Sequence, residues 1–272
     1  MASQHPAPFT DIHCHLIPGI DDGSQNWDDT LAMARMAVRD GISTIICTPH
    51  QLGNFRHNDG DTIRARTAEL QRVLNENQIP LRVLPGGDVR IESEMVRMIG
   101  EGSVMSLGDH RRHVLLELPH EMYIPLERLL AELASARLVG ILSHPERNQG
   151  ILNTPHVLGP LVDRGCLLQV TAGSLVGAFG PHIQRFTEDL VTQGLVHFVS
   201  TDAHSPKSRR PLLRRAFDRV AEITNFETAS DLCCHNPGCV AAGREVTAGR
   251  RSTKKAAPSR SGRGFFGWGR AA

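Results

Sequence analysis

The sequence lacks any run of roughly 18 or more apolar residues, the length that a membrane-spanning helix requires. Residues 1–10 also lack the charged-then-apolar order of a secretory signal peptide. The six cysteines, at positions 14, 47, 166, 233, 234 and 239, show no spacing typical of a disulfide scaffold. Together these absences favour a protein that is kept reduced in the cytoplasm.

Charge is distributed unevenly along a chain whose composition is otherwise ordinary. The 272 residues are 40% hydrophobic and 22% charged, as in soluble globular proteins, and are enough for a sizeable core. The formal net charge is +1, but residues 243–272 contain eight Lys or Arg against one Glu, which gives +7 there and −6 for residues 1–242. We therefore expect one domain, 1–242, and a basic tail, 243–272.

The predicted tail is rich in Arg, Lys, Ser and Gly and carries the sequence Gly-Phe-Phe-Gly-Trp-Gly near its end. This composition cannot support a packed core, so we expect disorder. Two interpretations stay open. The basic and aromatic residues suit weak contact with a membrane surface of anionic lipid or with an acidic protein, and a solvated terminus without a partner is equally compatible.

The first 242 residues alternate between short β-branched runs and amphipathic segments about seven times, which favours parallel strands with crossover helices in an α/β barrel. An open dinucleotide-binding sheet is the alternative, but no G-x-G-x-x-G pattern follows the first strand. The predicted strands are 9–13, 43–48, 81–84, 113–117, 138–142, 166–171 and 195–200. The predicted helices are 28–39, 61–76, 124–137, 155–164, 182–193, 211–224 and 228–242.

Residue types that bind metal ions follow the ends of most of these strands. A single His or Asp at a strand end is more often a cap or a satisfied core residue, but a recurring set in phase across six strands indicates a metal cluster. Imidazole and carboxylate ligands without thiolate suit Mn, Fe or Zn at a catalytic site. The residues are His13, His15, His50, Asp88, Glu117, His144, Asp202 and His204.

The strand ends and their following loops carry seven short motifs, which are Asp-Ile-His-Cys-His (11–15), Asp-Asp-Gly (21–23), Thr-Pro-His (48–50), Pro-Gly-Gly-Asp-Val-Arg-Ile (85–91), Leu-Leu-Glu-Leu-Pro (115–119), Ser-His-Pro-Glu-Arg (143–147) and Ser-Thr-Asp-Ala-His (200–204). In this order they resemble the polymerase-and-histidinol-phosphatase (PHP) superfamily, and most closely the bacterial metal-dependent protein-tyrosine phosphatases of capsule and exopolysaccharide clusters. The resemblance implies a distorted (β/α)₇ barrel with three metal ions. It also implies hydrolysis of phosphotyrosine on protein, especially on the tail of a bacterial tyrosine kinase that regulates polysaccharide synthesis and export.

The resemblance assigns the ligands to three ions, with Mn²⁺ expected and Fe or Zn as alternatives. It places His13, His15 and Asp202 on one ion, Glu117 and His144 on a second, with Asp88 bridging these two, and Asp22, His50 and His204 on the third. Two further roles are implied. Arg147 and Arg209 match arginines that grip the phosphate, and Asp202 or His204 would help to move a proton to the leaving phenolate.

Two positions depart from the pattern of this family. Asp88 stands where the family usually has Glu, and Gln51 stands where it usually has a second His. Two other functions therefore stay open: a PHP phosphoesterase for a small molecule such as histidinol phosphate, and a metal-binding regulatory module with weakened catalysis. We expect a phosphotyrosine protein as partner and no nucleic acid, and a homo-oligomer is compatible with the sequence.

Three other sequence features could indicate a different kind of site. No cysteine is followed by an arginine six positions later, which excludes a cysteine-dependent phosphatase. Residues 233–239 resemble a zinc cluster, but a helix with small buried thiols, broken at Pro237, is the favoured interpretation. Residues 171–180 are glycine-rich and suit a phosphate-cradling loop or a simple crossover loop equally.

Overall fold

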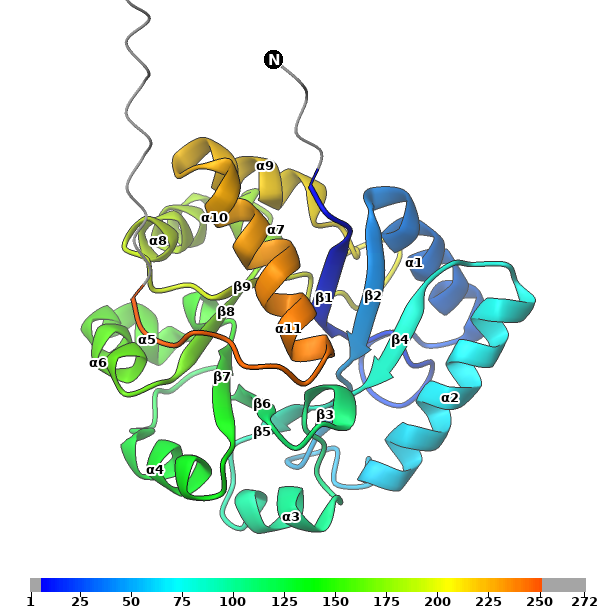
Figure 1. Cartoon of the computed structure of the whole chain (residues 1–272), viewed down its shortest axis with the longest axis horizontal. Coiled ribbons are helices and arrows are strands. Elements are labelled where there is room, and N and C mark those ends of the chain that lie inside the picture. Colours follow the sequence, from blue (N-terminus) through cyan, green and yellow to red (C-terminus); the bar gives the residue numbers. More distant parts are fainter. Residues whose placement is uncertain (1–5, 251–272) are drawn as a thin grey trace, which may run out of the picture.

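The computed structural model describes residues 6–250 and alternates parallel strands with helices around them (Figure 1). The strands are β1 (Phe9–Cys14), β2 (Ile42–Cys47), β3 (His50–Gln51), β4 (Arg82–Pro85), β5 (Asp88–Arg90), β6 (His113–Glu117), β7 (Val139–Ser143), β8 (Leu167–Thr171) and β9 (Phe198–Ser200). The helices are α1 (Trp27–Asp40), α2 (Gly60–Glu76), α3 (Met95–Glu101), α4 (Glu127–Ser135), α5 (Gln149–Asn153), α6 (Leu158–Asp163), α7 (Ala172–Leu175), α8 (Pro181–Thr192), α9 (Arg214–Ile223), α10 (Phe226–Ser230) and α11 (Asn236–Ala241).

The strands form two parallel sheets, in the orders β1-β2-β4 and β3-β5-β6-β7-β8-β9. Two stretches of the chain pass from the first sheet to the second. β2 is followed by β3 after a break at Pro49, and β4 is followed by β5 after Gly86 and Gly87. An isolated parallel bridge between Cys14 and Ala203 also joins the end of β1 to the segment after β9. The α/β class with parallel strands is therefore confirmed.

The break between β4 and β5 depends on two glycines that allow the backbone to approach its neighbours. A Cβ on Gly86 would lie 2.7 Å from Ile46 Cγ2, and a Cβ on Gly87 would lie 2.4 Å from Gln51 Oε1. A side chain at either position would force neighbouring side chains to shift, so glycine favours the close approach of the backbone at this bend. The bend turns β5 toward the second sheet and sets the direction of Asp88 at its start.

Apolar side chains from six strands pack into one interior cluster, together with residues of α11 and of a 3-10 turn at Leu107–Asp109. The amide of Asn236 in α11 donates to the carbonyl of His197, just before β9, so this helix lies at the amino ends of the strands. The opposite, carboxyl ends are thus free to carry polar groups. The cluster comprises Ile12, Ile46, Leu107, Leu115, Ile141, Leu167, Phe198, Val240 and Ala241.

Residues 243–250, the beginning of the predicted tail, lie against the amino ends of the strands. Arg112 donates to Glu245 at 2.9 Å, and Arg250 donates to both carboxylate oxygens of Asp163 at 3.0 Å. Val246 packs against the interior cluster. Figure 1 shows this segment passing from α11 toward α6. The remainder of the predicted tail, 251–272, lies outside the described residues.

Several predicted boundaries differ from the structure. The predicted helix 155–164 begins as a 3-10 turn and becomes α6, and the predicted helix 228–242 contains a π-helical turn at Asp231–His235. Pro237 does not end the helical run, which continues from Phe226 to Ala241; it lies just after the π-helical turn, whose altered hydrogen bonding accommodates a residue without an N–H. Among the helices of residues 6–250, none has both the length and the apolar character needed to span a bilayer.

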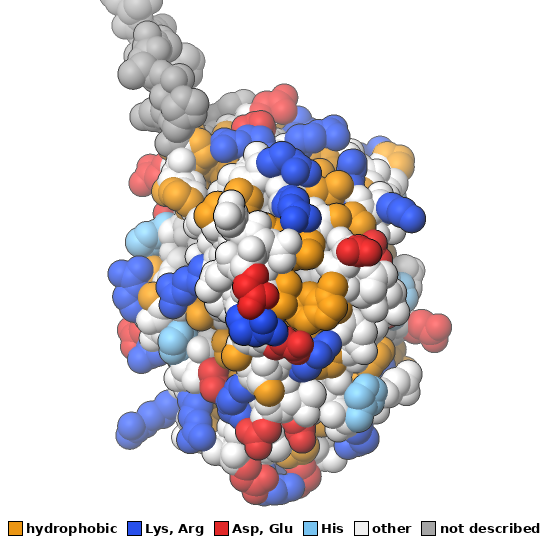
Figure 2. Space-filling model, turned by 90° about the vertical axis from the view of Figure 1, so that its right-hand side faces the viewer, with side chains coloured by type: hydrophobic (Ala, Val, Ile, Leu, Met, Phe, Trp, Pro, Cys, Tyr) orange, Lys and Arg blue, Asp and Glu red, His pale blue; other side chains and the backbone are white. Residues whose placement is uncertain are grey.

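The face of the molecule drawn in Figure 2 mixes acidic and basic side chains with apolar ones.

Candidate metal centre

Nine polar side chains meet where the strands end, and they are the nine residues that the sequence suggested as ligands. They form four overlapping groups, and within each group the potential ligand atoms lie within 4.8 Å of one another. The groups are His15, Asp22, His50 and His204; His13, His15 and Asp88; His13, His144 and Asp202; and His50, Asp88 and Glu117.

The groups differ from the division of ligands that the resemblance implies. Glu117 lies with His50 and Asp88, its Oε2 being 3.6 Å from His50 Nδ1, whereas His144 falls in the group of His13 and Asp202. Asp88 belongs to two groups, with Oδ2 at 3.5 Å from His13 Nε2 and 3.4 Å from His50 Nδ1. A carboxylate in this position is well placed to be shared by two ions.

Neighbouring side chains fix the orientation of the two histidines on β1 and after it. His13 Nδ1 lies 2.9 Å from Gln169 Oε1, and His15 Nδ1 lies 2.7 Å from Asp21 Oδ2. Both Nε2 atoms consequently face the cluster, 3.3 Å apart. A carboxylate or amide behind a histidine is the usual support of a metal ligand, because it sets the tautomer and the ring orientation.

Sequence reasoning missed the supporting roles of Asp21 and Gln169. Asp21 lies in the Asp-Asp-Gly motif and also accepts from the backbone N–H of His50, so its position beside Asp22 was an available signal. Gln169 lies on β8, a strand to which no ligand had been assigned, and nothing in its local sequence distinguishes it.

Several buried polar atoms of the cluster have no hydrogen-bond partner, and this indicates whether metal ions would suit the cluster. Both carboxylate oxygens of Asp88 are buried without a hydrogen bond within residues 6–250, as are His50 Nδ1 and His204 Nε2. Leaving such atoms unpaired destabilises a folded protein, by roughly 1–3 kcal/mol each. Divalent cations would satisfy all of them, and the mixed oxygen and nitrogen donors suit Mn, Fe or Zn.

Electrostatics in the cluster also favour bound cations. Burial, and then the nearby carboxylate of Asp88, raise the pKa of Glu117 to about 7. Burial, followed by the guanidinium of Arg147, lowers the pKa of His144 well below its usual value. Against the effect of burial, nearby carboxylates raise the pKa values of His13, His15 and His50, so cations that bind there would take the place of protons. A shared cation would also remove the repulsion between Asp88 and Glu117.

Two arginines converge beside the metal cluster. The Nη2 atoms of Arg147 and Arg209 both donate to Oδ2 of Asp202, while the Nε atoms of both arginines have no hydrogen-bond partner within residues 6–250. The Arg147 guanidinium also lies over the ring of Phe179, 4.8 Å from its centroid. This arrangement leaves donors of two guanidinium groups available to a phosphate at the edge of the cluster.

Three residues of the site have left-handed backbone conformations that non-glycine residues rarely adopt. The φ angles are 34° at His144, 50° at Asp202 and 47° at Arg209. Such conformations persist only where the surrounding structure imposes them, and they gather at functional sites. Here they redirect the chain as it leaves β7 and β9, so that successive side chains turn into the cluster.

Gln51, one of the two departures from the family pattern, lies next to the site but does not point into it. Its amide nitrogen donates to the carbonyls of Asn58 and Ser103, at 2.7 and 3.2 Å, and its Oε1 accepts from the N–H of Met105 at 2.7 Å. The side chain thus connects the loop after β3 to the segment after α3. Gln51 belongs to none of the four groups of potential ligands.

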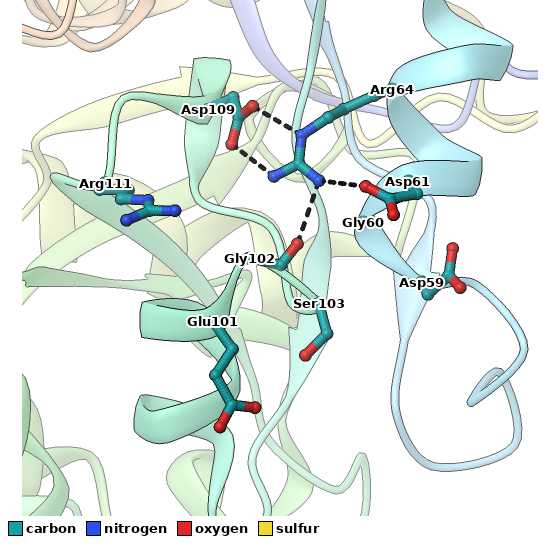
Figure 3. A pocket seen from close by; sticks show the side chains of 9 residues that line it. All are labelled: Asp59, Gly60, Asp61, Arg64, Glu101, Gly102, Ser103, Asp109 and Arg111. Carbon is teal, nitrogen blue, oxygen red and sulfur yellow. Dashed lines mark hydrogen bonds and ion pairs between the residues drawn. The ribbon is translucent and has the colours of Figure 1, made fainter.

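A cavity of about 520 Å³ lies away from this cluster, between the start of α2 and the end of α3. Figure 3 shows the Arg64 guanidinium between two carboxylates, donating to both oxygens of Asp109, to Asp61 and to the carbonyl of Gly102. These charges pair with one another, and none of the potential metal-binding groups within residues 6–250 includes a residue of this cavity.

The two other candidate motifs have structural explanations. Cys233, Cys234 and Cys239 are buried, and no metal-binding group within residues 6–250 includes them, which agrees with the helical interpretation. The glycine-rich segment begins at Thr171, the last residue of β8, and continues into α7; the N–H of Thr171 donates to the buried carboxylate of Glu146. That N–H is therefore not available to a phosphate.

A buried cluster of imidazoles and carboxylates beside paired arginines, at the carboxyl ends of parallel strands, is typical of metal-dependent enzymes that act on phosphate esters. The chain belongs to the family described as capsular polysaccharide synthesis, CpsB/CapC, whose pattern matches residues 9–242.

Relatives of known activity support this classification. The chain is 39% identical to the tyrosine-protein phosphatase YwqE of Bacillus subtilis over 201 residues, which cover 73% of this chain and 78% of YwqE. It is 22% identical to the tyrosine-protein phosphatase CpsB of Streptococcus pneumoniae, over 84% of this chain and 96% of CpsB. The fold matches a crystal structure from work on YwqE and CpsB as unique metal-dependent tyrosine phosphatases. The TM-score is 0.85 and the identity 33%, with 91% of this chain and all of the other covered.

Proposed function

We propose that this protein is a metal-dependent protein-tyrosine phosphatase that acts in the synthesis of a capsular or exported polysaccharide. The observation that supports this most strongly is that nine potential metal ligands lie together beside two arginines that converge on Asp202. The chain is also 39% identical to a tyrosine-protein phosphatase. The ligands would be His13, His15, Asp22, His50, Asp88, Glu117, His144, Asp202 and His204.

We infer three ions, the number that the resemblance implies, most simply Mn²⁺ with Fe or Zn as alternatives; the four overlapping groups of side chains offer enough ligands for them. Divalent cations at such a site lower the pKa of water and offset the charge on phosphoryl oxygens. Asp88, shared by two groups, would bridge two ions despite having one methylene fewer than the usual Glu. His13 and His15 would be held in register by Gln169 and Asp21.

The arginines and His204 have separate roles in this proposal. Arg147 and Arg209, both anchored on Asp202, would bind the phosphate and orient the phosphorus for in-line attack. His204 Nε2 lies 3.4 Å from Asp22 and is otherwise unpaired, so it would hold an ion together with His15, Asp22 and His50; a nitrogen used in this way does not also carry a proton to the leaving oxygen. Because phenolate, with a conjugate-acid pKa of about 10, leaves readily, only modest acid catalysis is required.

The proposal extends to features beyond the site itself. A distorted seven-stranded barrel is supported by the interior cluster from six strands and by the Cys14–Ala203 bridge. We further propose a cytoplasmic location and, as substrate, the tyrosine-containing tail of a bacterial kinase. The suggested membrane contact of 243–272, and self-association, stay predictions.

Substrate preference provides the test of this function. The full-length protein, supplied with Mn²⁺, should hydrolyse a phosphotyrosine peptide with a higher kcat/KM than histidinol phosphate. The two guanidinium groups beside the cluster would hold the phosphate, and a cavity of about 340 Å³, lined in part by Arg209, would leave room for residues next to the tyrosine. A preference for histidinol phosphate would indicate a small-molecule phosphoesterase, and metal binding without turnover of either substrate would indicate a regulatory module.

Substitutions of Asp88 test its bridging role. Asp88→Asn removes a negative charge from a site that gathers cations, so bound metal should decrease and turnover should fall by roughly tenfold or more. Asp88→Glu restores the usual reach of the family and should retain or raise the rate. Metal analysis and steady-state kinetics measure both effects, with Asp218→Asn on the exposed surface of α9 as control. Unchanged metal content in Asp88→Asn would contradict the bridge.

A further inference from the structure

A second cavity, of about 340 Å³, opens beside the arginine pair between α7 and the start of α9. Its walls combine apolar side chains with four cationic ones, and no acidic residue lines it. The apolar lining comes from Val176, Ala178, Phe179, Leu212 and Ala216, and the cationic lining from Lys207, Arg209, Arg210 and Arg215.

Three of these cations have no partner. Within residues 6–250, the side chains of Lys207, Arg210 and Arg215 make no hydrogen bond and no ion pair, and all three are exposed. The cavity of Figure 3 differs in this respect, since its Arg64 is paired with two carboxylates. The cations beside the arginine pair therefore retain their capacity to bind an anionic group.

The cavity is continuous with the proposed phosphate site. Arg209 belongs to both, because it lines the cavity and donates to Asp202. Phe179 also connects them, since its ring forms part of the cavity wall and supports the Arg147 guanidinium. A tyrosyl phosphate held by the two arginines would thus place its ring near Phe179 and the adjoining peptide residues near the unpaired cations.

We propose that this cavity binds acidic side chains that flank the phosphotyrosine of a protein substrate. The inference rests on the proposed function, and adds to it a preference for substrate sequence. Charge complementarity indicates which ligand the cavity would bind. Its three unpaired cations and its apolar lining match an aromatic residue with Asp or Glu beside it. Phe179 and Leu212 would contact the ring and the methylene groups of the peptide, and Arg210 and Arg215 would pair with its carboxylates.

The test compares phosphotyrosine peptides that differ only in charge near the modified tyrosine. One set carries Asp and Glu on either side of it, and the matched set carries Asn and Gln at the same positions. For the wild-type protein, kcat/KM should be roughly threefold to tenfold higher for the acidic peptides, as expected for two solvent-accessible ion pairs. The difference should lie mainly in KM and should shrink with added salt, because the pairs are screened.

A pair of double variants isolates the contribution of the cavity. Arg210→Gln with Arg215→Gln removes two of the unpaired cations and should bring the acidic-to-neutral ratio close to one. Arg82→Gln with Arg137→Gln makes the same change in charge at the amino ends of β4 and β7, on exposed arginines without ion pairs, and should keep the wild-type ratio. The single variants of the cavity should give intermediate ratios.

Each outcome separates this inference from the proposed function. Equal hydrolysis of acidic and neutral peptides by the wild type would overturn the acidic preference and leave the phosphatase function standing. Equal loss of selectivity in both double variants would also overturn it, because net charge and not the cavity would then be responsible. If the wild type hydrolysed no phosphotyrosine peptide, the proposed function would fail first.

Discussion

Replacing Asp202 by alanine should lower the turnover of a phosphotyrosine peptide by roughly a thousandfold or more. One carboxylate here serves two purposes: its Oδ1 lies 3.3 Å from His13 Nε2 in the metal cluster, and its Oδ2 accepts from both Arg147 and Arg209. The variant therefore loses a potential ligand and releases the two guanidinium groups. Bound metal, measured by elemental analysis, should fall together with kcat.

Two further variants separate the loss of a metal ligand from the loss of the arginine anchor. His144→Ala removes a member of the same ligand group but leaves the arginine anchor, so its metal content should fall while its affinity for inorganic phosphate falls less. Asp218→Ala, an exposed change on α9, should behave as the wild type. Near-normal turnover in both Asp202→Ala and His144→Ala would show that catalysis does not take place at this cluster.

Chelation should abolish activity, whereas alkylation of thiols should leave it intact. All six cysteines are buried, and none of them forms a disulfide bond. Burial raises the pKa of Cys166 to about 12 and that of Cys234 to about 11, and it raises the pKa of Cys14 well above its usual value. Thiolates, the reactive form, are thus scarce at neutral pH, and reagents have little access to the sulfur atoms.

The measurement is aryl-phosphatase activity after treatment with EDTA or iodoacetamide, each followed by removal of the reagent. Activity should return on addition of Mn²⁺ to the chelated protein, and comparison with Fe and Zn would identify the preferred ion. Loss of activity after alkylation, with bound metal unchanged, would assign catalysis to a thiol and contradict the proposed mechanism.

Much of the site could be predicted because its elements follow a simple rule. Parallel strands end at one rim, so a His or Asp after each strand can be placed near the others without knowledge of tertiary contacts. His144 and Asp202 were found in this way. The support of His13 by Gln169 joins residues that lie 156 positions apart, and such a contact leaves no local pattern.

Other elements escaped prediction because they are too short or too dependent on their surroundings. β3 and β5 contain two and three residues, which is below the length at which alternation can be recognised. The π-helical turn before α11 arises inside an apolar run that also fits a regular helix. The grouping of Glu117 with His50 depends on the bend between β4 and β5, which is imposed by close packing around Gly86 and Gly87.

The left-handed backbone conformations at His144, Asp202 and Arg209 lower the stability of the fold at positions whose side chains the proposed catalysis needs. Such conformations cost a non-glycine residue roughly 1–3 kcal/mol each, a substantial part of a typical folding free energy of about 5–15 kcal/mol. Glycine would relieve the strain at each position and remove an imidazole, a carboxylate or a guanidinium with it. Selection for heat resistance alone would therefore favour sequences that have lost these groups, so a library screened for melting temperature must also be screened for turnover.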